Sequence, residues 1–210
     1  MRPGGRSARV RSAVIEAVLA ELSGGGYEGL TVETVATRSG VHKATIYRRW
    51  GGVDGLVADA LAHSAEAPWP IPDTGTLAGD LQEITRAVLI GFTDPHLGAT
   101  ATALINAALR STQGARALAA FFAARLTQAA QVVTRAIDRG ELPPGVDAVE
   151  VVRAATAPLY YRLFITDEPV DDDVANRAAA AAVAAARAGV FDTAMGEQQG
   201  NTGRKADELD

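Results

Sequence analysis

The chain has 210 residues, of which 48% are hydrophobic but only 5% aromatic, and it contains no cysteine. This length suffices for one or two domains with cores of their own, built here mainly from Ala, Leu and Val. The lack of cysteine excludes disulfides, thiolate nucleophiles and Cys-ligated metals. No run is long enough to span a bilayer, and no apolar run follows the arginines of residues 1–12, so we expect a cytoplasmic protein without membrane contact.

The net charge of −5 conceals an uneven distribution. Residues 1–50 hold eight Lys and Arg against four Glu, whereas residues 51–210 hold twelve basic against twenty-one acidic residues. Two explanations are open: a basic module for a polyanion attached to an acidic body, or a solvated surface with uneven charge. We favour the first because the basic segment coincides with the helix-turn-helix predicted at Thr31–Trp50.

A first helix is expected from about Ser7 to Leu22, after a flexible arm at residues 1–6. Its apolar residues fall on one face: Val10, Val14, Ala17, Val18 and Leu22. The glycines at positions 24–26 are expected to end this helix. Tyr27 and Leu30 are expected to fill the small core that it shares with the following helices.

The stretch from Thr31 to Trp50 predicts two short helices joined by a turn. Thr31 is a suitable N-cap, because its hydroxyl can accept a hydrogen bond from a first-turn amide. Gly40 can adopt the left-handed conformation that ends a helix. The second helix, from Lys43, carries an apolar Ile46 between basic and polar residues. A short Gly-containing turn between two short helices is typical of a helix-turn-helix.

A fourth helix is expected from Val53 or Asp54, and the Pro-rich segment 68–72 ends it. We take this segment as a domain boundary. The sequence therefore predicts a head at residues 1–50, a connecting helix at 51–67, a helical body at 73–192 and a disordered tail at 193–210.

Five apolar-periodic stretches follow, and no strand pattern appears, so we expect an all-α protein of about nine helices: a three-helix head and a C-terminal helical bundle. The stretches cover Leu77–Phe92, Asp94–Leu109, Gly114–Arg139, Asp147–Thr166 and Asp171–Ala188. Pro158 predicts a kink in the fourth of them. Asp94 is a suitable cap for the second, with Pro95 at its first position.

The last stretch consists almost entirely of Ala between Ala178 and Ala186, apart from Val183. Asp171–Asp173 suit the positive end of its dipole, and Gly189 can terminate it. Such a helix is either an exposed helix of high propensity or one that allows another helix to approach closely. We favour the second, an interface helix.

Residues 7–63 resemble a TetR-family transcriptional regulator. The matching residues are Leu30-Thr31-Val32 with Val35-Ala36, Ser39-Gly40-Val41, Lys43-Ala44-Thr45-Ile46-Tyr47 with Trp50, and Leu56-Val57. The segment 157–163 is also similar to a motif in the next-to-last helix of one subset of the family. The resemblance implies a homodimer that binds double-stranded DNA and pairs through the final two helices, here 147–166 and 171–188. It also implies a ligand-binding body and, in most members, repression that a small molecule relieves.

Two positions depart from the family pattern. His42 stands where a small hydroxyl residue often precedes the recognition helix, and it is a poorer cap. It either reaches a phosphate or base edge or has no role in DNA binding. Val53 stands where a Lys often contacts a phosphate, so that contact is not expected here.

Residues of the predicted recognition helix and its surroundings are the candidates for DNA contacts. Tyr47 is the first choice for a phosphate contact, with packing on Trp50 as the alternative. Arg48 is the second backbone candidate, and Arg49 is expected to face solvent. Lys43 can reach a guanine or a phosphate, and Thr45 can contact a base edge or a phosphate. The full candidate set is Thr31, His42, Lys43, Thr45, Tyr47 and Arg48. Thr34 and the N-terminal arginines are further backbone candidates.

Helical bundles usually place ligand sites between their helices. The candidates for contact with an unknown small-molecule effector are Phe92, Leu104, Phe121, Phe122, Arg125, Tyr160 and Phe164. For each apolar member taken singly, a plain core position is the favoured alternative. Arg125 can pair with an acidic ligand or with Glu150. No metal or cofactor is expected.

Two other classes of function compete with a ligand-responsive regulator. An enzyme is disfavoured by three scattered His, no Cys and no phosphate-cradling Gly loop. A ligand-independent architectural or activating DNA-binding protein would show little sequence discrimination and a steep salt dependence.

Overall fold

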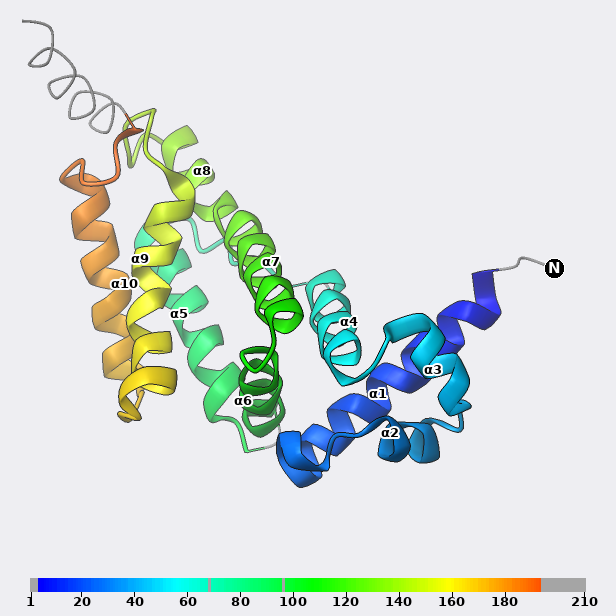
Figure 1. The fold of residues 1–210 in the computed structure, drawn as a ribbon. Coiled ribbons are helices and arrows are strands. Elements are labelled where there is room, and N and C mark those ends of the chain that lie inside the picture. Colours follow the sequence, from blue (N-terminus) through cyan, green and yellow to red (C-terminus); the bar gives the residue numbers. More distant parts are fainter. Residues whose placement is uncertain (1–3, 68, 96, 194–210) are drawn as a thin grey trace, which may run out of the picture. The chain divides into compact units, whose positions relative to one another are not determined.

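The computed structural model describes residues 4–67, 69–95 and 97–193, and Figure 1 shows that this part of the chain is built from helices. The α-helices are α1 (Gly4–Gly29), α2 (Val32–Ser39), α3 (Lys43–Trp50), α4 (Val53–Glu66), α5 (Leu77–Thr93), α6 (Leu97–Ala108), α7 (Thr112–Ala129), α8 (Gln131–Asp138), α9 (Ala148–Tyr161) and α10 (Asp172–Arg187). A π-helix, η1 (Arg162–Thr166), follows α9. The prediction of an all-α fold is confirmed. Between Val146 and Asp192 there is one isolated β-bridge but, within the described ranges, no strand.

The chain divides into two compact units. One comprises Met1–Trp69 and Ile90–Arg125, and the other Pro70–Leu89 and Leu126–Asp210. The first break lies inside the Pro-rich segment between α4 and α5. The predicted functional division into head, connecting helix and body remains a prediction, because compact packing and functional role are different properties.

The first helix is longer than the sequence suggested. It begins at Gly4 instead of Ser7 and runs through Gly24 and Gly25. Gly26 has a non-helical backbone, with φ 61° and ψ −161°, so the break predicted at these glycines is present, and a short helical stretch follows it to Gly29. Contacts with α2, α4 and α6 along α1 explain this difference. Tertiary packing of a helix outweighs the unfavourable helix propensity of glycine, which is only about 1 kcal/mol per residue.

The core of the first unit contains the apolar face predicted for α1. Val14, Val18, Leu22 and Leu30 are buried. The prediction that Tyr27 fills this core needs correction: Tyr27 is only half-buried, and the guanidinium of Arg110, which follows α6, lies 4.8 Å from the centroid of its ring. The aromatic side chain therefore lies at the rim of this core.

The predicted helix-turn-helix is confirmed in detail. The hydroxyl of Thr31 accepts a hydrogen bond from the amide of Thr34, whose hydroxyl in turn accepts from the amide of Thr31, forming a capping box. Gly40 ends α2 at φ 67°. A second left-handed glycine, Gly51, ends α3 and leads into α4, which begins at Val53 as predicted.

Two predictions for the later helices need correction. The stretch Gly114–Arg139 is not one helix but two, α7 and α8, because the amides of Val133 and Thr134 both donate to the carbonyl of Ala130 and tighten the turn there. The irregularity expected at Pro158 takes the form of a π-helix that begins four residues later, at Arg162.

In the second unit α10 packs against α9. Ala175, Ala179, Ala182 and Ala186 are buried on one face of α10, and Leu159 is buried on α9. Asp171 lies at the start of α10 as predicted, and it also caps the helix, because its carboxylate accepts a hydrogen bond from the amide of Val174 at 2.8 Å. The opposite face of α10 also carries small residues and is exposed, at Ala180, Ala181 and Ala184.

Within the described ranges no single helix is both long and apolar enough to cross a membrane; α5 and α6 meet the criterion only as a pair, with a bend of 86° between them. No cluster of metal-ligating side chains occurs in the same part of the chain. The predicted tail from residue 194 onward lies outside the described residues.

Candidate DNA-binding surface

The helix α3 has one buried face and one exposed face. Ile46 and Trp50 are buried, which fixes the rotation of the helix about its own axis. Lys43, Tyr47 and Arg48 are exposed, and Tyr47 exposes 50% of its surface. An exposed large aromatic beside basic side chains is consistent with a surface that contacts a polyanion.

His42 occupies the N-cap position of α3 but makes no capping hydrogen bond with its side chain. The expectation that it caps poorly is therefore confirmed. Its imidazole is exposed, next to the amide-rich start of the helix, where a phosphate can be bound.

The threonine hydroxyls near the start of α2 make hydrogen bonds within the protein that stabilise the start of this helix. Thr34 Oγ1 donates to the carbonyl of Gly29 at 3.0 Å while Thr31 caps the helix. Thr45, on α3, is half-buried. Thr31 and Thr45 thus lie at the helix-turn-helix as predicted, but neither is as exposed as Lys43 or Arg48.

Arg49 is exposed as expected, yet its guanidinium is held in place. Its Nη1 donates to the carbonyl and the hydroxyl of Ser7, at 3.1 Å each, and the group lies 4.8 Å above the ring of Trp50. Arg49 therefore lies over the Trp50 ring, whereas Tyr47, the alternative candidate to pack on it, is half exposed.

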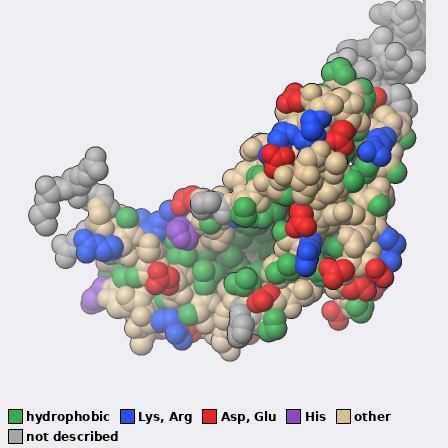
Figure 2. Space-filling view, turned by 180° about the vertical axis from the view of Figure 1, so that it is seen from behind, with side chains coloured by type: hydrophobic (Ala, Val, Ile, Leu, Met, Phe, Trp, Pro, Cys, Tyr) green, Lys and Arg blue, Asp and Glu red, His purple; other side chains and the backbone are tan. Residues whose placement is uncertain are grey.

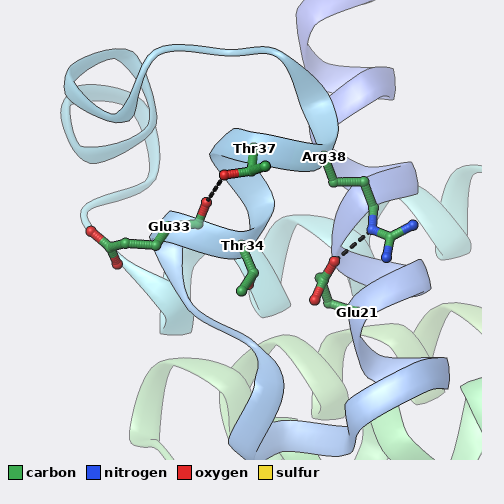
Figure 3. A pocket seen from close by; sticks show the side chains of 5 residues that line it. All are labelled: Glu21, Glu33, Thr34, Thr37 and Arg38. Carbon is green, nitrogen blue, oxygen red and sulfur yellow. Dashed lines mark hydrogen bonds and ion pairs between the residues drawn. The ribbon is translucent and has the colours of Figure 1, made fainter.

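A groove of about 450 Å³ lies between α1 and α2 and is drawn in Figure 3. Two carboxylates, from Glu21 and Glu33, line it together with Thr34, Thr37 and Arg38. Arg38 Nε lies 2.5 Å from Glu21 Oε1, so the positive charge of Arg38 is neutralised within the groove. The groove therefore does not attract phosphate.

The surface view shows how charge is distributed on one face. Lys and Arg side chains lie among Asp and Glu there and do not form one continuous basic patch (Figure 2). The net positive charge of residues 1–50 therefore does not by itself locate the DNA-binding face. The geometry of α3 is needed to locate it. Some of these cations are already paired: Lys43 with Glu33, Arg38 with Glu21 and Arg11 with Asp59.

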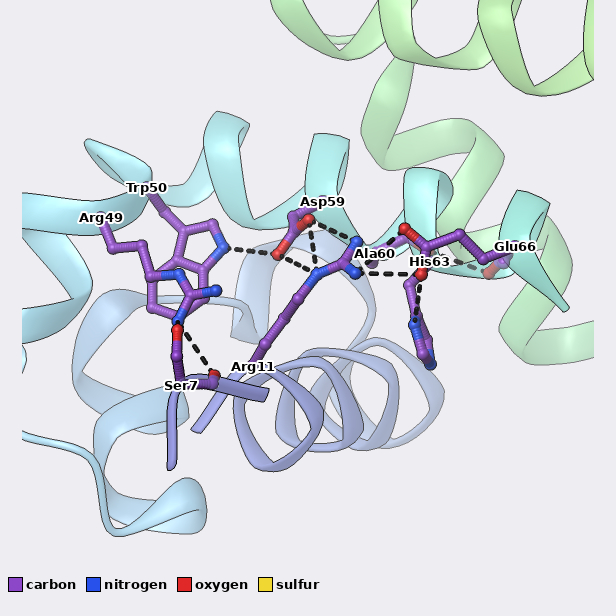
Figure 4. A network of polar contacts seen from close by, with 9 residues as sticks. Ser7, Arg11, Arg49, Trp50, Asp59, Ala60, His63 and Glu66 are labelled. Atoms are coloured by element: carbon purple, nitrogen blue, oxygen red, sulfur yellow. Dashed lines mark hydrogen bonds and ion pairs between the residues drawn. The ribbon is translucent and has the colours of Figure 1, made fainter. Parts of the chain in front are cut away.

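A polar network that the sequence did not predict joins α1, α3 and α4 (Figure 4). Asp59 accepts hydrogen bonds from Arg11 and from the Trp50 indole. Burial acts to raise the pKa of Asp59, but these hydrogen bonds and the charges of Arg11 and Arg49 outweigh it and lower the pKa below its usual value. The pKa of Arg11 is raised in turn, chiefly by the hydrogen bond to Asp59.

The network gives Arg11, one of the N-terminal arginines considered for DNA-backbone contacts, partners within the protein. Residues from Gly4 onward are helical, and Arg11 is engaged by two carboxylates of α4. The sequence does contain a signal for it, since Asp59 and Glu66 are seven residues apart and so share one face of α4. The partner on α1 could not be identified from that spacing.

The seven candidates for effector contact are divided between the two units. Phe92 lines a groove of about 450 Å³ with residues of α1, of α6 and of the turn after α6, among them Tyr27, Thr102, Asn106 and Arg110. Leu104 is buried core, and Phe121 and Phe122 pack edge to face with ring centroids 5.4 Å apart. Tyr160 and Phe164 are half-buried and belong to the other unit.

Arg125 has partners other than the Glu150 carboxylate that was considered for it. Its Nη2 donates to the carbonyl of Ser64 at 2.6 Å and its Nη1 to the carbonyl of Ala67 at 3.2 Å, both at the C-terminal end of α4. Its guanidinium also lies 5.8 Å from the ring of Trp69. Glu150 instead forms an ion pair with Arg153, at 3.1 Å.

Comparison with known proteins places this geometry in a family. Residues 14–60 match the model of bacterial regulatory proteins of the tetR family, and residues 71–182 match that of the tetracyclin repressor-like C-terminal domain. The first match covers the helix-turn-helix described above. The second covers most of the helices that follow α4.

Relatives and solved structures agree with these matches. The chain is 35% identical to the HTH-type transcriptional regulator AqdR of Rhodococcus erythropolis, over 70% of each chain. It is 30% identical to the uncharacterized regulator YdeS of Bacillus subtilis, over 80% of this chain and 84% of that one.

Among solved structures, the TetR-family transcription regulator SCO0332 is 34% identical, with a TM-score of 0.66 and coverage of 83% of this chain and 96% of that one. A regulator from Mesorhizobium loti has the same fold at 23% identity, with a TM-score of 0.63 and coverage of 90% and 99%. These relatives are DNA-binding regulators and not enzymes. The chain belongs to the TetR family of transcriptional regulators.

Proposed function

We propose that the protein is a dimeric repressor that binds a palindromic operator through α3 and is released by a small molecule. The observation that carries the proposal is the division of α3 into a buried face, with Ile46 and Trp50, and an exposed face, with Lys43, Tyr47 and Arg48. Its site of action is the cytoplasm, where bacterial DNA lies.

The contacts follow from the chemistry of the exposed side chains. Lys43 and Thr45, at the start of α3, are assigned to base edges. Tyr47 and Arg48 are assigned to phosphates, which set the register of the protein on DNA. Thr31 and His42, at the starts of α2 and α3, support the backbone contacts through helix N-termini.

The dimer is assigned to α9 and α10. Their exposed surface carries Ala157, Ala180, Ala181 and Ala184 together with the exposed aromatic Tyr161. Small residues allow two helices to approach closely, and a second copy would cover this surface. Two recognition helices about 34–36 Å apart would then enter successive major grooves on one side of the DNA.

Repression and release require a ligand that binds better to the conformation that does not bind DNA. Phe92 is one candidate contact, because it lines the groove beside α6 within one compact unit. The alternative is a ligand-independent architectural or activating protein with the same head.

Selection of bound duplexes from a random pool tests the proposal with the full-length protein. A palindrome with half-sites one helical turn apart, and a mass of two chains per bound duplex, is the expected result. A flat sequence preference with a steep salt dependence would favour the architectural alternative. Lys43→Ala should relax the selected sequence, whereas Arg116→Ala, an exposed change on α7, should leave it unchanged.

A further inference from the structure

The C-terminal end of the recognition helix rests directly on the first turns of α4. A Cβ atom placed on Gly55 would lie 1.8 Å from the carbonyl oxygen of Trp50 and 2.8 Å from its carbonyl carbon. Only glycine permits this approach, because real Cβ atoms do not come so close to backbone. The two helices are therefore in backbone contact at this joint.

One turn further along α4, Asp59 makes a second contact with the same tryptophan. Trp50 Nε1 donates to Asp59 Oδ2 at 2.8 Å. Gly55 and Asp59 are four residues apart and so lie on one face of α4. The last residue of the recognition helix is thus held on α4 by its backbone and by its indole N–H.

Arg11 of α1 binds the same Asp59 carboxylate and holds it in place. Its Nε lies 3.0 Å from Asp59 Oδ1, and its Nη1 lies 3.0 Å from Glu66 Oε1, two turns further on (Figure 4). The side chains of Arg11 and Asp59 expose only 25% and 23% of their surface. One guanidinium therefore spans two carboxylates of α4 while one of these carboxylates holds Trp50.

The far end of α4 is held by a different helix. Arg125 of α7 donates to the carbonyls of Ser64 and Ala67, where the negative end of the helix dipole favours a cation. These carbonyls lie about 8–12 Å along the helix axis from Asp59, at 1.5 Å per residue. Helix α4 is thus fixed at one end to the recognition helix and at the other to α7.

We propose that Asp59 is a positioning residue for DNA recognition, which fixes the recognition helix on α4 through Trp50 and Arg11. This inference rests on the proposed function, since it concerns how the head binds an operator.

The physical reason is that the polar network orients the recognition helix more than it stabilises the fold of the head. The head already has an apolar core that includes Val35, Ile46 and Leu56, all fully buried. Ion pairs that remain partly exposed stabilise a fold little. Their hydrogen bonds are directional, however, and Asp59 accepts from two different helices. Loss of these bonds would leave the head folded with its recognition helix less well oriented.

The test uses full-length protein and the duplex that wild type selects from a random pool. Asp59→Ala removes both hydrogen bonds. Asp59→Asn keeps an acceptor for the indole but removes the charge that Arg11 needs. Arg11→Gln removes the other partner, and Glu83→Gln, an exposed change on α5, is the control for the Asp59→Asn change in charge.

Asp59→Ala is expected to weaken operator binding about tenfold or more, the equivalent of 1.4 kcal/mol. The slope of affinity against salt should stay the same, because no phosphate contact is lost. In a Trp69→Phe background, where Trp50 is the remaining tryptophan, Asp59→Ala should also shift the indole emission. Arg11→Gln combined with Asp59→Asn should be no weaker than either change alone, since the pair acts as one unit.

A folded Asp59→Ala variant that binds the operator as wild type does would overturn the proposal, and so would weaker binding accompanied by a lower salt slope. If Asp59→Ala does not fold, the same criteria apply to Asp59→Asn and Arg11→Gln. Failure of wild type to select any sequence would instead refute the proposed function, so the two failures are distinguishable.

Discussion

Glu33 Oε1 lies 2.9 Å from Lys43 Nζ, so the first turn of α2 forms an ion pair with the first residue of the recognition helix. The hydrogen bond from Lys43 lowers the pKa of Glu33. Both side chains are more than half exposed, at 55% and 52%. If Lys43 contacts DNA, its ammonium group must leave the Glu33 carboxylate or interact with both at once.

Glu33→Gln is expected to strengthen operator binding at low salt several-fold. The change removes a competitor for Lys43 and a negative charge beside the phosphates, and the gain should shrink as salt screens both effects. Fluorescence anisotropy at two salt concentrations measures it. Glu16→Gln, an exposed change on α1, alters the net charge equally; an equal gain for both variants would show that the ion pair has no part in it.

Arg48→Ala separates backbone contacts from base contacts. If Arg48 binds a phosphate, affinity should fall by a similar factor for all sequences and the salt slope should fall by about 1. Lys43→Ala, if Lys43 reads a base, should cost about 1–3 kcal/mol on the selected operator and much less on a mismatched one. Binding measured on both duplexes decides the roles, and the reversed pattern would exchange them.

Gly55→Ala should destabilise the protein by about 1–3 kcal/mol, because the new methyl group collides with backbone and not with a movable side chain. Gly91 offers the matched control: it lies in α5, and a Cβ there meets nothing within 4 Å. Gly91→Ala should stabilise by about 0.5–1 kcal/mol through helix propensity. Thermal melts of both variants provide the comparison; similar shifts would contradict the close contact at Trp50.

The lowered pKa of Asp59 predicts a contribution to stability that depends on pH. Because the folded-state pKa is below the unfolded value of about 3.9, the contribution is fully present above that value and is lost as pH falls through the folded pKa. Wild type should therefore exceed Asp59→Asn in stability at neutral pH, and the gap should close in acid. Denaturant unfolding across this range measures the gap, and a gap that does not change with pH would contradict the ionised contact.

Ala184→Glu places a charge on the exposed face of α10. If a second copy covers that face, the variant should become monomeric in sedimentation, because an unpaired charge would be buried in the interface. Ala119→Glu, on an exposed position of α7, is the control and should not alter the mass. A dimer that persists in Ala184→Glu would exclude this surface as the interface.

Several elements were predictable because their signals are local. Thr31, Gly40 and Asp171 act within one or two turns of their own positions, and each does what its residue type predicts. The break at Ala130 was missed because no glycine or proline marks it. The continuation of α1 through Gly24 and Gly25 was missed because helix packing outweighs their low propensity.

The candidate site was predictable to a similar degree. The periodicity of α3 separates Ile46 from Lys43, Tyr47 and Arg48, and the structure places these residues on the buried and exposed faces accordingly. The partners of the charged residues were not predictable. Each basic residue could form an ion pair with many different acidic residues, and the spacing in the sequence does not show which pairs form.

The sequence by itself determined the all-α class, the helix-turn-helix and its caps, and the small-residue character of α10, because each depends on neighbours within a few residues. Only the tertiary structure decided that Arg11 joins Asp59, 48 residues away, and that Arg125 holds the Ser64 carbonyl, 61 residues away. Such contacts form when packing brings distant helices together, and the geometry of that packing is not written in any local pattern.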